Sequence, residues 1–294
     1  MLSVLDLFSR EHTTMTADQI AEALELTRTT CYRYTRELGQ AGLLVSDGGL
    51  FMLGPRIIEL DHRIIESDPL LRAGTPVVTA LADSIGATGL LTTSYHDRVI
   101  NVFQHEGSLA PLPLSFGRGT TMPLFRSSTS KMILASMSRS RLKRLWNQHQ
   151  DEPDCRAVGA DWLSFWKSLQ AIKRQGYWTS AGELDATLAG ISAPILYGTG
   201  EVAGSMSLVF SIEDFKVYGM ELLGARLRAA AAQVSRALAA SLREPPEAKA
   251  LAERAAGRRS GRAGAKPAVK PAATPRRAKL ARRAARLRTI GGPD

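Results

Sequence analysis

The sequence predicts an α+β protein with a small N-terminal head, a larger domain built on a sheet, and a basic tail. Residues 1–53 combine three short helical patterns with one hairpin, which is typical of a winged helix-turn-helix. Residues 69–242 interleave strand and helix patterns without a strict βαβ repeat, which favours a sheet with helices on one side of it. Residues 243–294 contain no aromatic side chain and are rich in Ala, Arg, Lys and Pro, a composition typical of disorder.

Local signals define the elements of the head. Thr16 and Thr27 each precede a helical pattern and are expected to cap it. Gly42 stands where the later helix should end, at a position that favours positive φ. Two short apolar runs then flank the segment 46–49, Ser-Asp-Gly-Gly, which is a strong hairpin signal. Helix, turn, helix and hairpin in this order predict a winged helix-turn-helix over residues 1–53.

The helix after Thr27 is the candidate DNA-reading element. Its inward positions are Cys31, Tyr34 or Thr35, and Leu38, so arginines and threonines remain on the outer face. In a winged helix-turn-helix this helix enters the major groove, where Arg pairs with guanine or phosphate. A charge cluster alone would equally suit a solvated face, but the neighbouring helix and hairpin favour DNA contact. The candidate DNA-binding residues are Arg28, Thr29, Thr30, Tyr32, Arg33 and Arg36.

Positive charge is concentrated at the C-terminal end of the chain. The protein has 38 Lys and Arg against 28 Asp and Glu, but residues 243–294 hold 15 of the basic and only 4 of the acidic side chains. Residues 1–66 are acidic, with 6 basic and 10 acidic side chains. The overall charge is therefore no evidence that the folded domains bind DNA. The tail has two open interpretations, a disordered arm that pairs with phosphates and a solvated segment that only aids solubility.

The larger domain follows a predicted linker helix over residues 54–68. Helical patterns within it cover residues 70–84, 131–137, 141–149, 162–175 and 219–242. Strand patterns cover residues 90–95, 99–104, 177–182, 191–196 and 202–210. Glu213 and Asp214 are expected to begin one further short helix, where acidic side chains favour the helix dipole.

Several classes of protein are excluded by simple counts. No run approaches the roughly 18 apolar residues of a membrane helix, and the N-terminus lacks the pattern of a secretory signal. Cys31 and Cys155 follow neither a metal-binding nor a disulfide spacing, and the five histidines include no i,i+4 pair. We therefore expect a cytoplasmic protein without a metal or other cofactor and without a membrane partner, associated with the nucleoid through DNA.

One short motif suggests an enzyme. The segment from Ser128 to Lys131 matches the S-x-x-K pattern of serine acylases, in which a lysine activates the nucleophile. Those enzymes also need S-D-N and K-T-G elements, and neither follows Lys131 in this sequence. A four-residue match in a serine-rich stretch is expected by chance, so the sequence predicts no enzyme.

Ordered motifs along residues 1–242 carry a family resemblance. In the head they are residues 20–26, 30–33, 38–43 and 53–56, and in the larger domain residues 117–135, 174–183 and 191–195. Their order and spacing resemble those of IclR-type (isocitrate-lyase-regulator) bacterial transcription regulators. The resemblance implies a winged-helix domain, a linker helix, and an effector-binding domain at 69–242 with a curved antiparallel sheet and flanking helices. It also implies a homodimer or homotetramer on a roughly palindromic double-stranded operator.

The resemblance also places an effector site in the larger domain. The residues implied are Phe116, Ser128, Thr129, Ser180, Gly190, Ser192 and Ser207. Small hydroxyls and backbone amides near a helix start suit an anion, so the expected effector is a small carboxylate or aromatic acid. Gly190 departs from the family, which often has cysteine before its Ala-Pro motif.

Two function classes remain open at this stage. The first is a ligand-responsive, DNA-binding transcription regulator. The alternative is a nucleoid-type DNA-binding protein that acts mainly through its basic tail. Arg28, Tyr32 and Arg33 discriminate between them, because only the first class needs these side chains for specific binding.

Overall fold

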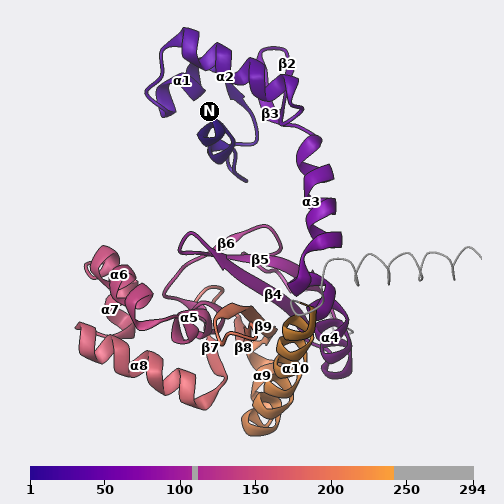
Figure 1. The fold of residues 1–294 in the computed structure, drawn as a ribbon, viewed down its shortest axis with the longest axis vertical. Helices are drawn as coiled ribbons and strands as arrows, with labels where there is room; N and C mark the ends of the chain where they lie inside the picture. Colours follow the sequence, from indigo (N-terminus) through magenta and orange to yellow (C-terminus); the bar gives the residue numbers. More distant parts are fainter. Residues whose placement is uncertain (108–111, 242–294) are drawn as a thin grey trace, which may run out of the picture. The chain divides into compact units, whose positions relative to one another are not determined.

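The computed structural model describes residues 1–107 and 112–241 (Figure 1). The tail predicted at 243–294 lies outside these residues. The described chain forms a head with a three-stranded sheet, a linker helix, and a domain with a six-stranded sheet. None of its helices is both long and apolar enough to cross a membrane.

The head has the predicted order of elements. They are the 3₁₀ helix η1 (Leu2–Leu7), β1 (Met15–Thr16), α1 (Ala17–Ala23), α2 (Arg28–Gln40), β2 (Leu44–Asp47) and β3 (Leu50–Leu53). Thr16 caps α1 by accepting a hydrogen bond from the Gln19 N–H at 3.2 Å, and the Gln19 side chain accepts the Thr16 N–H at 2.8 Å. Thr27 caps α2 by accepting the Thr30 N–H at 3.3 Å. Both predicted caps are thus present in full.

Glycines set the two tight bends of the head. Gly42 follows the end of α2 with a φ of +73°, where a Cβ would be strained. Gly48 and Gly49 join β2 to β3 with φ values of +55° and +84°, which are the values of a two-residue hairpin turn. The hairpin of β2 and β3 therefore follows α2 directly, and both pack on a core that includes Ile20 and Leu38.

The larger domain is built on one antiparallel sheet in the order β6-β5-β4-β9-β8-β7. Its strands are β4 (Thr88–Tyr95), β5 (Arg98–His105), β6 (Thr121–Met122), β7 (Trp178–Ala181), β8 (Leu188–Leu196) and β9 (Val202–Ser211). Its helices are α4 (Pro69–Ile85), α5 (Ser127–Ser136), α6 (Arg139–His149), α7 (Pro153–Val158), α8 (Trp162–Gln175), α9 (Ile212–Val217) and α10 (Met220–Ser241). The linker helix α3 (Arg56–Ser67) precedes α4.

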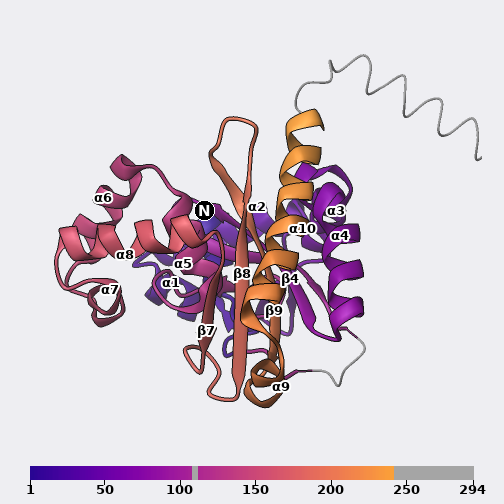
Figure 2. The ribbon, with the colours of Figure 1, turned by 90° about the horizontal axis from the view of Figure 1, so that it is seen from below.

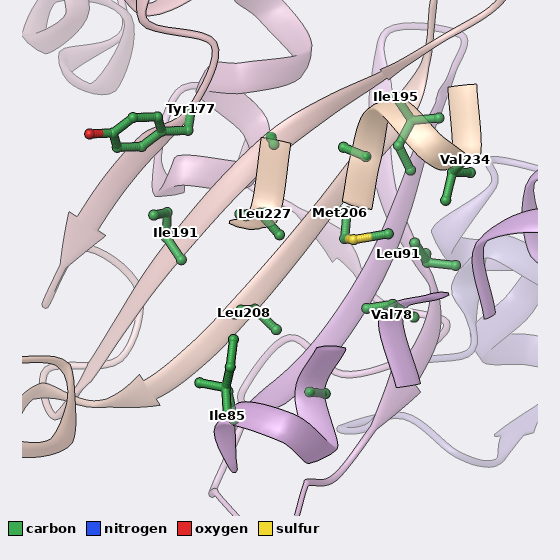
Figure 3. Packing of buried hydrophobic residues seen from close by; sticks show 14 of the residues in the cluster. Val78, Ile85, Leu91, Tyr177, Ile191, Ile195, Met206, Leu208, Leu227 and Val234 are labelled. Carbon is green, nitrogen blue, oxygen red and sulfur yellow. The ribbon is translucent and has the colours of Figure 1, made fainter. Parts of the chain in front are cut away.

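Helices cover both faces of this sheet, and not one side as the pattern of elements suggests (Figures 1 and 2). Helices α4 and α10 bury one apolar cluster against the sheet, in which Val78 and Leu227 meet Ile191 and Met206 (Figure 3). Helices α5, α6, α7 and α8 form a second cluster with β5 and β6. Successive side chains of a strand point to opposite faces of the sheet, so a sheet with apolar or small residues at both sets of positions can bind helices on both faces. On the α5 side β8 presents small residues, which allow the helix to approach closely.

The predicted elements are otherwise present within a few residues, with three exceptions. Two strands of two residues, β1 and β6, and the short helix α7 were not predicted. Helix α5 begins at Ser127, four residues before the predicted start, because polar side chains from β7 and the segment after it bind its first turn. That turn is also part of the candidate effector site.

Candidate functional site

The outer face of α2 presents the predicted DNA-binding side chains. Arg28, Thr29, Tyr32, Arg33 and Arg36 are exposed, whereas Thr30 is half-buried and donates its N–H to the Thr27 cap. Tyr32 is 58% exposed, which is a large exposed fraction for an aromatic residue. The inward residues Cys31, Thr35 and Leu38 are buried. The division of α2 into two faces is therefore the predicted one, and Tyr34 lies between them.

An acidic neighbour orients one of these arginines. The Arg28 Nε lies 3.0 Å from Asp18 Oδ1, and its second guanidinium nitrogen lies 3.1 Å from Asp18 Oδ2. Asp18 belongs to the first turn of α1, so it joins the two helices of the motif. Arg33 instead lies over the ring of its neighbour Tyr34, 5.3 Å from the centroid. Among the residues that the structure describes, Arg28 uses two of its guanidinium nitrogens in the contact with Asp18.

The larger domain contains a cavity of about 470 Å³, including its open mouth, between α5 and the sheet. Five of the predicted effector residues line it: Phe116, Ser128, Thr129, Ser180 and Gly190. Further lining residues are Leu90, Leu114, Met122, Ser127, Glu183, Leu184, Asp185, Leu188, Ala189 and Val209. Most of the wall is apolar, and the polar groups gather near the start of α5, a distribution that suits a small organic ligand.

The remaining two predicted residues lie behind the cavity and do not line it. Ser192 and Ser207 are fully buried, and their hydroxyls are 2.8 Å apart on the adjacent strands β8 and β9. Thr129 Oγ1 lies 2.9 Å from Ser207 Oγ and 3.2 Å from Ser192 Oγ. Ser192 Oγ donates to Ser128 Oγ at 2.9 Å. These four hydroxyls form a buried network that ends at the cavity, where Ser128 and Thr129 belong to the lining.

The first turn of α5 is held by groups that come from β7 and the segment after it. The Ser128 N–H donates to Ser180 Oγ at 2.9 Å, and the Ser127 N–H donates to Glu183 Oε2 at 2.9 Å. Ser127 has a φ of +71°, which is unusual for a residue with a side chain, and these bonds hold it there. Lys131 Nζ contacts both carboxylate oxygens of Glu183, at 2.9 and 2.8 Å. Arg126 donates to the Glu183 carbonyl.

The cavity wall carries negative charge. Glu183 and Asp185 are its charged side chains among the described residues, and no Lys, Arg or His belongs to the lining. Asp185 accepts hydrogen bonds from both the N–H and the hydroxyl of Ser115. Sequence reasoning missed both carboxylates as site residues, although Gly182-Glu183 belongs to the motif that placed Ser180.

The cavity wall continues into a contact with the linker helix. Phe116 lines the cavity, and two residues later Arg118 binds both oxygens of Asp61 on α3, at 3.0 and 2.6 Å. Arg118 Nε also donates to the Val102 carbonyl at 2.8 Å. The hydrogen bonds from Arg118 hold the pKa of the Asp61 carboxyl below its ordinary value. This ion pair fixes α3 to the domain that contains the cavity.

The described part of the chain offers neither a set of metal ligands nor a reactive thiol. It contains no cluster of three or more His, Cys, Asp or Glu that would hold a metal ion. Cys31 and Cys155 are both buried and unpaired with each other, and burial raises the pKa of Cys155 to about 11. A thiol with so high a pKa is a poor nucleophile at neutral pH.

The fold is that of a helix-turn-helix head joined by a linker helix to a separate domain that contains a cavity. Comparison with family models agrees, since the IclR helix-turn-helix domain matches residues 1–48 and the bacterial transcriptional regulator IclR C-terminal domain matches residues 62–236. The chain belongs to the IclR family, which is made up of transcriptional regulators and not enzymes. This membership does not favour the nucleoid-type alternative.

Individual relatives are distant but similar over most of their length. The Pca regulon regulatory protein of Pseudomonas putida is 22% identical over 207 residues, which are 70% of this chain and 71% of that protein. The p-hydroxybenzoate hydroxylase transcriptional activator of Acinetobacter baylyi is 22% identical over 203 residues, 68% of this chain and 75% of that protein.

Solved structures share the fold. An IclR regulator from Alicyclobacillus acidocaldarius has a TM-score of 0.67 at 23% identity, covering 80% of this chain and 95% of that one. An IclR homologue from Microbacterium hydrocarbonoxydans, complexed with 4-hydroxybenzoate, has a TM-score of 0.63 at 24% identity, covering 81% and 97% of the two chains.

Proposed function

We propose that this chain regulates transcription in response to a small molecule, reading a roughly palindromic operator with α2 and sensing an effector in the cavity beside α5. The observation that supports this most strongly is the pairing, in one chain, of an exposed arginine-rich helix with a hydroxyl-lined cavity. The Arg118–Asp61 pair joins the wall of that cavity to the helix that leads to the head. A ligand-dependent change at the wall then has a physical route toward the DNA-binding domain.

On DNA, the side chains of α2 divide by position. Arg28 and Thr29 lie in its first turn, where the partial positive charge of the helix end favours phosphate or base-edge contacts. Arg33 and Arg36 follow on the exposed face and suit bidentate pairing with guanine. Tyr32 directly precedes Arg33 on the same exposed face, and in this proposal it packs against a sugar or a thymine methyl group. Thr30 acts indirectly in this scheme, because it completes the cap that starts the helix.

In the cavity, the apolar wall accepts the ring or chain of the effector, and the hydroxyls at the start of α5 orient its polar end. The resemblance led to an expected carboxylate or aromatic acid. One relative is named for p-hydroxybenzoate hydroxylase and one neighbour was solved with 4-hydroxybenzoate, which makes single-ring aromatic compounds the first probes to try. Ser192 and Ser207 support the site from behind and do not touch the ligand in this proposal.

Self-association follows from the linker helix. α3 has no buried residue, and Ile58 and Ile64 are 72% and 53% exposed. Together with Ile65 they form an exposed apolar stripe that a second copy of the chain would cover. A two-fold dimer also presents two α2 helices, and so fits a palindromic site.

The test begins by selecting bound fragments from genomic DNA with the full-length protein and measuring affinity for the site obtained. Arg33→Ala is expected to weaken operator binding about 5- to 150-fold, the range for removal of a bidentate pairing with a base. Arg63→Ala is the matched control, because Arg63 is also a helical arginine but lies on α3. It should bind within about twofold of the wild type. Equal binding by wild type and Arg33→Ala would exclude α2 as the reading helix.

A further inference from the structure

Two of the usual donors for an anion at the start of α5, the N–H groups of Ser127 and Ser128, are already in use. An anion at a helix N-terminus binds its unpaired N–H groups. Here the N–H of Ser127 donates to Glu183, and the N–H of Ser128 donates to Ser180. Lys131, the basic side chain in the first turns of α5, contacts both oxygens of the same Glu183 carboxylate. The protein's own carboxylate therefore already takes the first N–H of α5 and the Lys131 ammonium, two groups that would attract a ligand carboxylate.

The negative charge of the cavity wall also disfavours a ligand carboxylate. A ligand carboxylate in the cavity would approach Glu183 and Asp185 without a basic side chain on the described lining to offset them. At the effective dielectric constant of about 20 that suits such sites, like charges several ångströms apart repel strongly enough to change affinity about tenfold or more. Lys131 offsets part of this repulsion because it is paired with Glu183. An uncharged ligand avoids the repulsion altogether.

Two hydroxyls remain available to such a ligand. Ser128 Oγ accepts a hydrogen bond from Ser192 Oγ, and Ser180 Oγ accepts one from the Ser128 N–H. Within residues 1–107 and 112–241, neither hydroxyl has an acceptor for its own proton. The donors in the buried network behind Ser128 polarise one another, which strengthens Ser128 as a donor toward the cavity. Both hydroxyls can therefore donate to an oxygen of the ligand.

Gly190 leaves the space for that oxygen. A Cβ at this position would lie 3.1 Å from Ser128 Oγ and 3.9 Å from Ser180 Oγ, so the missing side chain opens the point where the two hydroxyls converge. Gly190 has an ordinary strand conformation, and its backbone therefore does not explain the glycine. The space between the hydroxyls does explain it.

From this arrangement we infer that the cavity selects an uncharged ring compound with a carbonyl or hydroxyl acceptor, such as an aromatic amide, alcohol or phenol, over the corresponding carboxylate. The inference rests on the proposed effector role of the cavity and specifies its ligand class. It departs from the anionic effector that the sequence resemblance implied. The ring lies against the apolar wall formed by Leu90, Phe116 and Val209, and the acceptor oxygen lies between Ser128 and Ser180.

Matched pairs of probes test the inference by calorimetric titration of the full-length protein at pH 7.5. The pairs are benzamide against benzoate, and 4-hydroxybenzamide against 4-hydroxybenzoate, which differ in charge but hardly in size. We expect each amide to bind at least about tenfold more tightly than its acid. Glu183→Gln should reduce this preference by at least about threefold, because it removes one carboxylate and frees Lys131. Asp151→Asn, a change at an exposed carboxylate outside the cavity, should leave the preference unchanged.

A second variant keeps the test decisive if Glu183→Gln does not fold. Gly190→Ala places a methyl group between the two hydroxyls and should weaken the amides about tenfold, with little effect on folding because its contact is with a rotatable hydroxyl. Tighter binding of the acids by the wild type would overturn the inference and leave the effector site standing. Binding of none of the four probes would instead contradict the proposed effector site itself.

Discussion

Ser192→Ala removes the central hydroxyl of the buried network and tests whether that network supports ligand binding. Ser192 Oγ lies 2.9 Å from Ser128 Oγ, 3.2 Å from Thr129 Oγ1 and 2.8 Å from Ser207 Oγ. Thr129 and Ser207 can still bond to each other at 2.9 Å, so the substitution does not leave every partner unpaired. With about 1 kcal/mol for each net hydrogen bond removed, we expect a destabilisation of about 1–2 kcal/mol. For a domain of this size that lowers Tm by about 2–8 °C.

The same change should weaken binding of benzamide about three- to tenfold. Without the donor from Ser192, Ser128 Oγ loses the hydrogen bond that orients it and the polarisation that strengthens it as a donor toward the cavity. Ser205→Ala is the matched control, because Ser205 is an equally buried serine on β9 whose hydroxyl lies 2.6 Å from Thr92 Oγ1 and which does not line the cavity. Thermal unfolding by circular dichroism and calorimetric titration give the two readouts. Equal effects of both variants on benzamide affinity would refute the role of the network.

Three further predictions follow from other parts of the chain. Arg118→Gln should speed amide hydrogen exchange in α3 up to about fivefold at pH 7, measured by mass spectrometry. In the wild type the pKa of Asp61 is lowered, so the stabilisation that the ion pair gives to α3 is present above the ordinary carboxyl pKa and is lost as the pH falls through the lowered value. Equal exchange in variant and wild type at pH 7 would exclude a stabilising role for the ion pair. Ile58→Glu should shift the protein toward monomer in sedimentation experiments, because it places charge on the exposed stripe of α3, and an unchanged sedimentation profile would argue against that interface. Deletion of residues 245–294 should lower affinity for any DNA and flatten its salt dependence, by about 0.9 in the log–log slope for each phosphate that the tail no longer neutralises, whereas an unchanged slope would exclude the tail as a DNA arm.

Local physics explains why the head could be predicted closely. Caps at Thr16 and Thr27 and the turn at Gly48 and Gly49 depend on residues within four positions of each other, and each is present. The start of α5 could not be predicted in the same way. Its serines have weak helix propensity, and the groups that hold its first turn, Ser180 and Glu183, lie more than 50 residues away.

The sheet and the cavity also depend on distant contacts. Strand patterns identified the main strands, but periodicity does not say which element covers each face. The helices α5, α6 and α8 were therefore predicted, but not that they cover a second face of the sheet. The resemblance placed Ser192 and Ser207 with the lining residues, whereas the register of β8 and β9 puts both beneath Thr129. The negative wall was missed because Asp185 gains its place through Ser115, 70 residues earlier in the chain.

The central claim is that ligand binding in the cavity changes affinity for the operator. Fluorescence anisotropy of a labelled operator, titrated with wild-type protein with and without saturating benzamide, measures this coupling directly. We predict a change in operator affinity of about 5- to 150-fold, the range of typical allosteric coupling. In Gly190→Ala, half of this change should need about tenfold more benzamide than in the wild type. The contradicting result would be an unchanged operator affinity under conditions where calorimetry detects bound benzamide.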